Sequence, residues 1–64
     1  MVLTERERNV LYYLAQGYKN SEIGEVLNIS VHTVKAHLKK TFRKLDVSNR
    51  TEAVYVAVKN HIIE

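Results

Sequence analysis

The sequence has no cysteine, no proline and no tryptophan, and only two of its 64 residues are glycine. Without cysteine, neither a disulfide nor a zinc site built on thiolates can form. The longest wholly apolar run, residues 53–58, is far shorter than the roughly 20 residues that a helix needs to span a bilayer. The first residues contain no apolar stretch of signal-peptide length. We therefore expect a cytoplasmic protein with no membrane partner.

The chain is short for a folded protein. Its 64 residues make one domain at most, and an apolar content of 45% is too high for a disordered chain. Below about 70–80 residues, a single hydrophobic core supplies only a few kcal/mol of stability. Because no disulfide reinforces the core, we expect help from a partner subunit, a companion domain or a ligand.

The charge of the chain is concentrated in one segment. The formal net charge is +3, but residues 31–45 hold five lysines and arginines and no acid, while the rest of the chain is slightly acidic. A surface of this kind attracts polyanions, either nucleic acid or an anionic membrane. The alternative is a solvated helix face that binds nothing.

Helical spacing and capping residues predict an all-α protein, a compact four-helix bundle. Thr4 with Glu7 three residues later is the sequence of a capping box at the start of the first helix. Gly17 stands where that helix ends, because glycine readily takes left-handed backbone angles. Asn49, with Glu52 three residues on, caps the fourth helix in the same way. The predicted helices cover about residues 5–16, 21–27, 31–45 and 50–60 of one domain over residues 1–64.

The second helix is short and is followed by a tight turn. Asn20 is its expected cap. Gly24 inside it costs roughly 1 kcal/mol against alanine, which indicates that another backbone or helix packs closely there. In the turn, Asn28 tolerates left-handed geometry, and Ser30 caps the third helix. The inward-facing residues of this part are expected to be Ile23, Val26, Leu27 and Ile29.

The third helix combines a core stripe with a basic flank. At 100° per residue its expected core residues fall within an arc of roughly 80°, and the basic residues follow over roughly the next 140°. Two short helices joined by a tight turn, the second with a basic flank, form a helix-turn-helix, whose second helix fits a major groove about 12 Å wide. The core stripe is Val34, Leu38, Phe42 and Leu45, and the flank is Lys35, Lys39, His32, Arg43, Ala36 and Lys40.

The apolar run at residues 53–58 also has strand propensity, but the cap before it and the polar residues after it favour a helix. Six consecutive apolar positions wrap all the way round a helix, which is more than one intramolecular face uses. The excess indicates an oligomer interface or burial against another domain.

Short runs along nearly the whole chain resemble one family of DNA-binding modules. The runs are LTERE at 3–7, NSEI at 20–23, ISVHTVKAH at 29–37, KL at 44–45 and RTEA at 50–53. They resemble the LuxR-type DNA-binding domain, also called the GerE or NarL/FixJ output domain. The resemblance implies a bacterial transcription regulator, or the output domain of a response regulator, with the third helix in the major groove and dimerisation through the fourth helix.

The resemblance also implies roles for single residues. Lys35, Ala36 and Lys39 match base-contacting positions, which suits their chemistry because lysine donates to guanine and alanine contacts the thymine methyl group. Glu22 and Arg50 match residues that pair across the bundle. The expected phosphate-contacting residues are Lys19, Asn20, His32, Thr33, Lys40 and Arg43, and the expected dimer-interface residues are Tyr55, Val56 and Lys59.

No catalytic or metal-binding pattern accompanies these features. His32 and His37 lie about 140° apart around the third helix and share no ligand face, and His61 is isolated. The sequence has no glycine-rich phosphate loop, nucleophile elbow or carboxylate dyad. We therefore expect no metal, no cofactor and no enzymatic activity.

The expected partners are double-stranded DNA, a second copy of the chain on that DNA, and RNA polymerase, with no small-molecule ligand in this segment. The expected location is the bacterial cytoplasm, at the nucleoid. Two alternatives remain open. One is a protein-interaction module whose fourth helix docks a partner and whose basic flank is incidental. The other is a helix-turn-helix of the sigma-factor region 4 type, against which the Thr-Val-Lys-x-His run argues.

Overall fold

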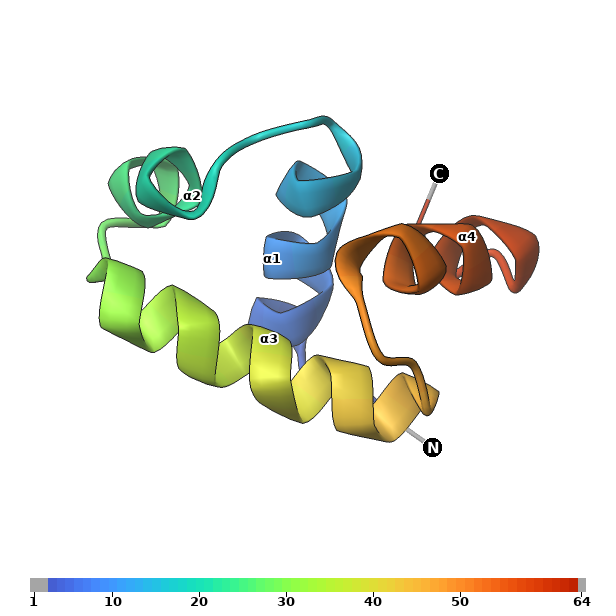
Figure 1. Ribbon diagram of the computed structural model, residues 1–64. Coiled ribbons are helices and arrows are strands. Elements are labelled where there is room, and N and C mark those ends of the chain that lie inside the picture. Colours follow the sequence, from blue (N-terminus) through green and yellow to red (C-terminus); the bar gives the residue numbers. More distant parts are fainter. Residues whose placement is uncertain (1–2, 64) are drawn as a thin grey trace.

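The computed structural model describes residues 3–63 and divides them into four helices (Figure 1). The helices are α1 (Glu5–Ala15), α2 (Asn20–Leu27), α3 (Val31–Leu45) and α4 (Arg50–Lys59). The all-α class is confirmed, and this part of the chain contains no strand. α1 contacts each of the other three helices, whereas α2 and α4 do not touch. α1 is thus the central element, and α3, the longest helix, runs along one edge of the molecule.

The core consists of apolar side chains from all four helices. α4 contributes only alanines to its fully buried part, and the small methyl side chains let α4 lie close to α1. Leu3 and Ile63, outside the helices, are also buried and close the core at both ends of the described chain. The apolar residues with no exposed surface are Val10, Leu11, Ile23, Val34, Ala53 and Ala57.

Local capping explains where most of the helices begin and end. The capping box of α1 is confirmed: the Thr4 hydroxyl accepts from the Glu7 N–H at 3.0 Å, and the Glu7 carboxylate accepts from the Thr4 N–H at 2.8 Å. Gly17 has the expected positive φ, +91°. The Asn49 side chain accepts from the Glu52 N–H at 2.9 Å, so α4 is a helix and not a strand. α1 and α4 each end one residue earlier than expected.

The start and the inner face of α2 differ from the prediction. Asn20 is not the cap but the first helical residue, because the Glu22 carboxylate accepts from the N–H of Lys19 at 2.8 Å and draws the helix start back by one residue. Val26 is 49% exposed and does not face inward. A helix of only eight residues reaches the core with one narrow face, on which Ile23 and Gly24 are buried.

The turn between α2 and α3 is tight because of Gly24. A Cβ atom at this position would lie 2.7 Å from the carbonyl oxygen of Ile29. That residue in turn donates its N–H to the carbonyl of Gly24 at 2.9 Å, and Asn28 takes the left-handed conformation with φ +57°. The prediction that a backbone packs closely against Gly24 is confirmed. The backbone concerned belongs to the turn that sets the direction in which α3 leaves α2.

The inner face of α3 is rotated slightly from its expected position. Thr41, and not Phe42, is fully buried, while Phe42 is half-buried at the edge of the core. The Thr41 hydroxyl remains satisfied in the core because it donates to the carbonyl of His37 at 2.8 Å. Ser30 caps the helix as expected by accepting from the Thr33 N–H at 3.0 Å. The side of α3 that faces solvent follows from this packing.

Candidate nucleic-acid interface

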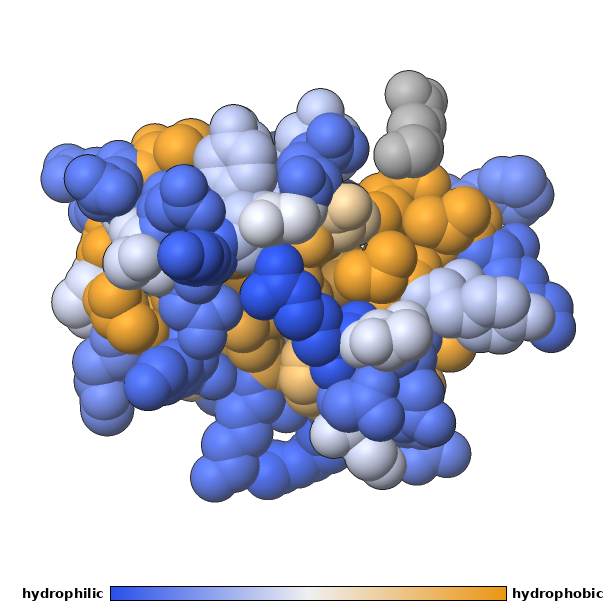
Figure 2. Space-filling view, turned by 45° about the horizontal axis from the view of Figure 1, so that its top comes forward, coloured by the Kyte–Doolittle hydropathy of each residue, from blue (hydrophilic) through white to orange (hydrophobic). Residues whose placement is uncertain are grey.

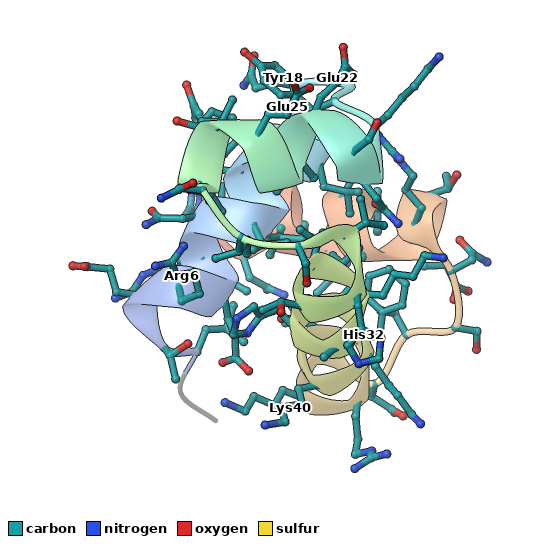
Figure 3. All side chains as sticks on the ribbon, turned by 90° about the vertical axis from the view of Figure 1, so that its left-hand side faces the viewer. Arg6, Tyr18, Glu22, Glu25, His32 and Lys40 are labelled. Atoms are coloured by element: carbon teal, nitrogen blue, oxygen red, sulfur yellow. The ribbon has the colours of Figure 1, made fainter. Side chains whose placement is uncertain are left out.

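The solvent-facing side of α3 carries the residues that the sequence places on the basic flank. Val34, Leu38, Thr41 and Leu45 point inward, so the opposite side of the helix is left open. In Figure 3, His32 lies on the side of α3 away from α1, and Lys40 lies at the lower edge of α3, away from α2. The structure brings six of the nine predicted DNA-contacting residues onto this one exposed face: His32, Lys35, Ala36, Lys39, Lys40 and Arg43.

Four cations on this face, Lys35, Lys39, Lys40 and Arg43, make no ion pair with any described residue between 3 and 63. Lys44, the fifth cation of α3, binds Glu7 instead. The acidic side chains of α2 lie elsewhere, with Glu22 and Glu25 on the side of that helix away from α3 (Figure 3). The potential above the open face of α3 is therefore positive, which attracts a polyanion.

The other three predicted contacts lie outside this face. Thr33 is half-buried at the start of α3, where its hydroxyl oxygen lies 2.9 Å from that of Ser30. Lys19, which is exposed, and Asn20, which is half-buried, belong to the start of α2. All three lie at or beside helix N-termini, where free backbone N–H groups and the helix dipole favour anions.

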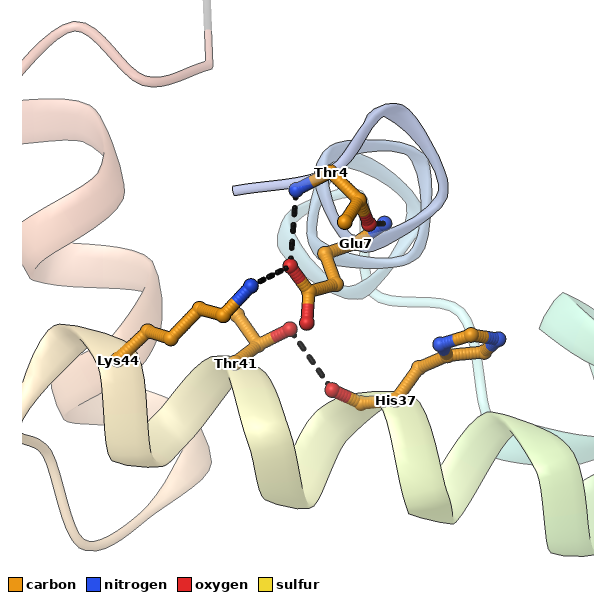
Figure 4. Close-up of polar contacts among 5 residues, drawn as sticks. All are labelled: Thr4, Glu7, His37, Thr41 and Lys44. Carbon is orange, nitrogen blue, oxygen red and sulfur yellow. Dashed lines mark hydrogen bonds and ion pairs between the residues drawn. The ribbon is translucent and has the colours of Figure 1, made fainter. Parts of the chain in front are cut away.

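Lys44 and Glu7 form an ion pair that sequence reasoning missed. The Lys44 ammonium lies 2.6 Å from the Glu7 carboxylate, whose side chain is only 3% exposed (Figure 4). Burial by itself raises the pKa of Glu7. The Lys44 ammonium and the hydrogen bonds from Thr4 outweigh burial, so the pKa of Glu7 lies below its ordinary value of 4.5. The carboxylate is thus charged in the folded domain and stabilises it.

The lowered pKa of Glu7 predicts a loss of stability in acid. Because the folded-state pKa is below the unfolded one, Glu7 stabilises the domain fully above about pH 4.5, and this contribution is lost as the pH falls through the folded-state pKa. Urea unfolding followed by circular dichroism from pH 7 to pH 3 should show a steeper acid decline for the wild type than for Glu7→Gln. Glu25→Gln, at an exposed position of α2, controls for the loss of one negative charge. Parallel profiles for the wild type and Glu7→Gln would contradict the assignment.

The family resemblance implied that Arg50 pairs with Glu22, but the structure contains no such pair within residues 3–63. Its guanidinium donates instead to the carbonyls of Leu14, at 3.3 Å, and Tyr18, at 2.7 Å. Glu22 is engaged with the N–H of Lys19. Arg50 therefore joins the first residue of α4 to the end of α1 and to the loop before α2. The sequence does not predict these partners of Arg50, because any exposed carbonyl can accept from an arginine.

The outer side of α4 carries two large, exposed apolar side chains. Tyr55 is 62% exposed and Val58 is 52% exposed. The Lys59 ammonium lies 5.6 Å from the centre of the Tyr55 ring, a cation–π contact. Val56, which the sequence analysis expects in a dimer interface, is half-buried, whereas Val58 is exposed. Figure 2 shows apolar side chains gathered over this end of the molecule.

Neither a metal centre nor a membrane-spanning helix is found among the described residues. Residues 3–63 contain no group of three histidine or acidic side chains that could hold a metal ion. None of the helices in this range is long and apolar enough to cross a membrane.

A short helix, a tight turn and a longer helix with a basic, outward-facing side define a helix-turn-helix DNA-binding domain. Residues 1–57 match the GerE model of bacterial regulatory proteins, the luxR family. The chain belongs to the luxR family, whose members are DNA-binding transcription regulators and not enzymes.

Individual relatives agree with this assignment. The transcriptional regulatory protein LiaR of Bacillus subtilis (strain 168) is 48% identical over 61 residues, which are 95% of this chain and 29% of LiaR. The crystal structure of the response regulator ChrA from a heme-sensing two-component system superposes with a TM-score of 0.94 at 40% identity, over 98% of this chain and 31% of ChrA. The chain thus spans less than a third of either protein.

A third relative has almost the same extent as this chain. The DNA-binding domain of the response regulator ComA, solved in complex with the anti-activator RapF, superposes with a TM-score of 0.85 at 41% identity. The match covers 88% of this chain and 97% of the ComA domain. The four helices described above are therefore an arrangement that also occurs as a separate DNA-binding domain.

Proposed function

We propose that residues 1–64 form one sequence-specific DNA-binding domain and that α3 is its recognition helix. The observation that carries the proposal is the open face of α3, with four cations that no acid within residues 3–63 neutralises. The helix has 15 residues. At 1.5 Å per residue it is about 22 Å long, and a helix of this kind fits a major groove about 12 Å wide.

Base contacts are assigned to Lys35, Ala36 and Lys39. All three are exposed, and Ala36 lies close to the middle of the open face, opposite the core residues. Its small side chain allows close approach to the floor of the groove, where its methyl group can contact a thymine methyl. The lysines on either side can then reach guanine O6 and N7.

Phosphate contacts are assigned to residues of α3 around the base-contacting residues and to residues at the start of α2. Ser30 can donate its hydroxyl proton to Thr33, which leaves the Thr33 proton for a phosphate oxygen. The first turn of α2, which Lys19 precedes, offers backbone N–H groups. The assigned residues are Lys19, Asn20, His32, Thr33, Lys40 and Arg43.

Fluorescence anisotropy with a random duplex of about 25–30 base pairs tests DNA binding. If Lys19, Lys40 and Arg43 each neutralise one phosphate, affinity falls about fortyfold per protomer between about 50 and 200 mM salt. A folded, helical protein that binds no duplex at the lower salt would support the alternative of a protein-docking module.

Lys35→Ala tests sequence reading. On an operator selected from the random pool, we expect discrimination against the wrong base at one position to fall by about 1–3 kcal/mol. Lys40→Ala, which removes a proposed phosphate contact from the same helix, should weaken all duplexes alike. If Lys35→Ala also weakens every duplex equally, Lys35 does not read a base.

We also assign a dimer interface to the outer side of α4, with Tyr55, Val56 and Lys59 joined by Val58. The support is the exposed apolar area around Tyr55 and Val58, which a second copy can cover. Two such domains would place their α3 helices in successive major grooves, about 34 Å or 10 base pairs apart. Sedimentation on the selected operator should give two chains per duplex, and Tyr55→Ser should reduce this to one. A single chain per duplex for the wild type would refute the interface.

In the whole regulator, this domain would act in the bacterial cytoplasm by binding DNA and positioning RNA polymerase. Transcription reconstituted from an operator-bearing template with purified polymerase tests that role. A transcript level that does not change when the domain binds would refute it.

A further inference from the structure

Glu7 is the one buried acidic side chain among residues 3–63. One of its carboxylate oxygens, Oε1, accepts two bonds, from the Thr4 N–H at 2.8 Å and from the Lys44 ammonium at 2.6 Å (Figure 4). The first bond caps α1. The second ties the start of α1 to a residue that lies 37 positions further along the chain, in the last turn of α3.

The ion pair and the α2–α3 turn hold α3 at its two ends. At the beginning of α3, the close approach of Gly24 to Ile29 fixes where the helix leaves α2. At its end, Lys44 is drawn towards α1 and away from its exposed neighbour Arg43. Between these points α3 packs through apolar contacts, which determine its inner face but, unlike a hydrogen bond, have no directional preference.

A directional contact matters for a helix that reads bases. Side chains reach about 5–6 Å from a helix axis, so a rotation of about 20° moves their ends by about 2 Å. A displacement of that size breaks a hydrogen bond to a base edge, because donor and acceptor must lie within about 3.2 Å. A contact to a phosphate at the groove edge tolerates the displacement better, because the attraction between charges falls off gradually with distance.

We propose that Glu7 is a positioning residue for sequence recognition, which through Lys44 fixes the rotation of α3 about its own axis. The proposal rests on the proposed role of α3 as the recognition helix. The proposal distinguishes the preference for one operator sequence from the charge-driven affinity for any duplex. Loss of the ion pair lowers the preference for the operator, whereas the charge-driven affinity for any duplex stays the same.

The test uses the double variant Glu7→Gln/Lys44→Met. Both replacements are close in shape to the originals, glutamine can still accept from the Thr4 N–H, and the net charge remains +3 because one charge of each sign is removed. The matched control is Glu25→Gln/Arg8→Met, which removes one charge of each sign at exposed positions on α2 and α1. Circular dichroism establishes that each variant is folded.

Affinities for the selected operator and for a scrambled duplex are then measured across a range of salt concentrations. We expect the ratio of the two affinities to fall at least about fivefold in the Glu7→Gln/Lys44→Met variant, the lower end of what one base contact contributes. The salt dependence on the scrambled duplex should equal that of the wild type. The control should change neither quantity.

Other outcomes overturn the proposal. An unchanged ratio shows that the ion pair does not position α3. A salt slope smaller by about 0.9 shows that Lys44 contacts a phosphate. A purely structural role would reduce the folded fraction and lower both affinities equally, which leaves the ratio unchanged.

A second variant, Glu7→Asp, is used for the same measurement if the double variant does not fold. It keeps the charge but draws the carboxylate back by about 1.5 Å, the length of one carbon–carbon bond. The ratio should fall again, and an unchanged ratio overturns the proposal. If the wild type itself binds no duplex, the proposed function fails. If the wild type binds and Lys35→Ala loses discrimination while both Glu7 variants retain it, only the positioning role fails.

Discussion

Replacing Lys40 and Arg43 together by glutamine lowers the affinity for a random duplex by about 60-fold per protomer at about 0.1 M salt. Each neutralised phosphate contributes about 0.9 to the slope of log affinity against log salt, so two lost contacts remove about 1.8 from it. Both side chains are exposed on the open face of α3, and neither has an ion pair to lose among residues 3–63. The change therefore acts on DNA binding without disturbing the packing of α3.

The matched control is Arg6→Gln/Arg8→Gln on α1, which brings the net charge of the chain to the same value. Both arginines are exposed. If binding depends on the place of the charges, the control loses only a few-fold in affinity and retains the slope. Equal losses in the two variants would mean that DNA responds to net charge and that the face of α3 has no special role.

Lys44→Met is the substitution with the largest expected effect on stability. It leaves the Glu7 carboxylate buried without its cation, and breaking a buried ion pair in this way costs about 3–5 kcal/mol. We expect about 3 kcal/mol, since the Lys44 side chain is 34% exposed and water can partly replace it. In a domain of this size, a loss of 3 kcal/mol lowers the melting temperature by roughly 12–24 °C.

Thermal melts of three variants test whether the broken ion pair with Glu7 causes this loss of stability. Arg43→Met, at the neighbouring exposed position, should melt close to the wild type. Glu7→Gln/Lys44→Met should regain much of the lost stability, because no charge is then left buried. Lys44→Met should also recover part of it in acid, where Glu7 takes up a proton. A Lys44→Met melt like that of Arg43→Met would show that the ion pair adds nothing to the fold.

The features that the sequence predicted correctly depend on neighbours within a few residues. Thr4, Ser30 and Asn49 cap helices by bonding an N–H three positions ahead, and Gly17 and Asn28 take left-handed angles through their own chemistry. Patterns of this range are visible in a chain without its tertiary structure. The four helices and the basic side of α3 follow from them.

The features that the sequence missed depend on tertiary contacts or on competition between close alternatives. The partner of Glu7 lies 37 positions away, and nothing local distinguishes Lys44 from the lysines that stay exposed. At α2, Glu22 competes with Asn20 to cap the helix, and the carboxylate prevails. Thr41 is buried in place of Phe42 because its hydroxyl can bond within its own helix.

The contacts of Arg50 tie together parts of the chain that could otherwise open separately. Its guanidinium bonds the carbonyls of Leu14 and Tyr18, so detaching α4 also breaks these bonds to the end of α1 and to the loop beyond it. Such links make segments unfold as one cooperative unit. Backbone amides in the last turn of α1 and in α4 would then exchange with solvent deuterium through the same opening event and be protected to the same degree.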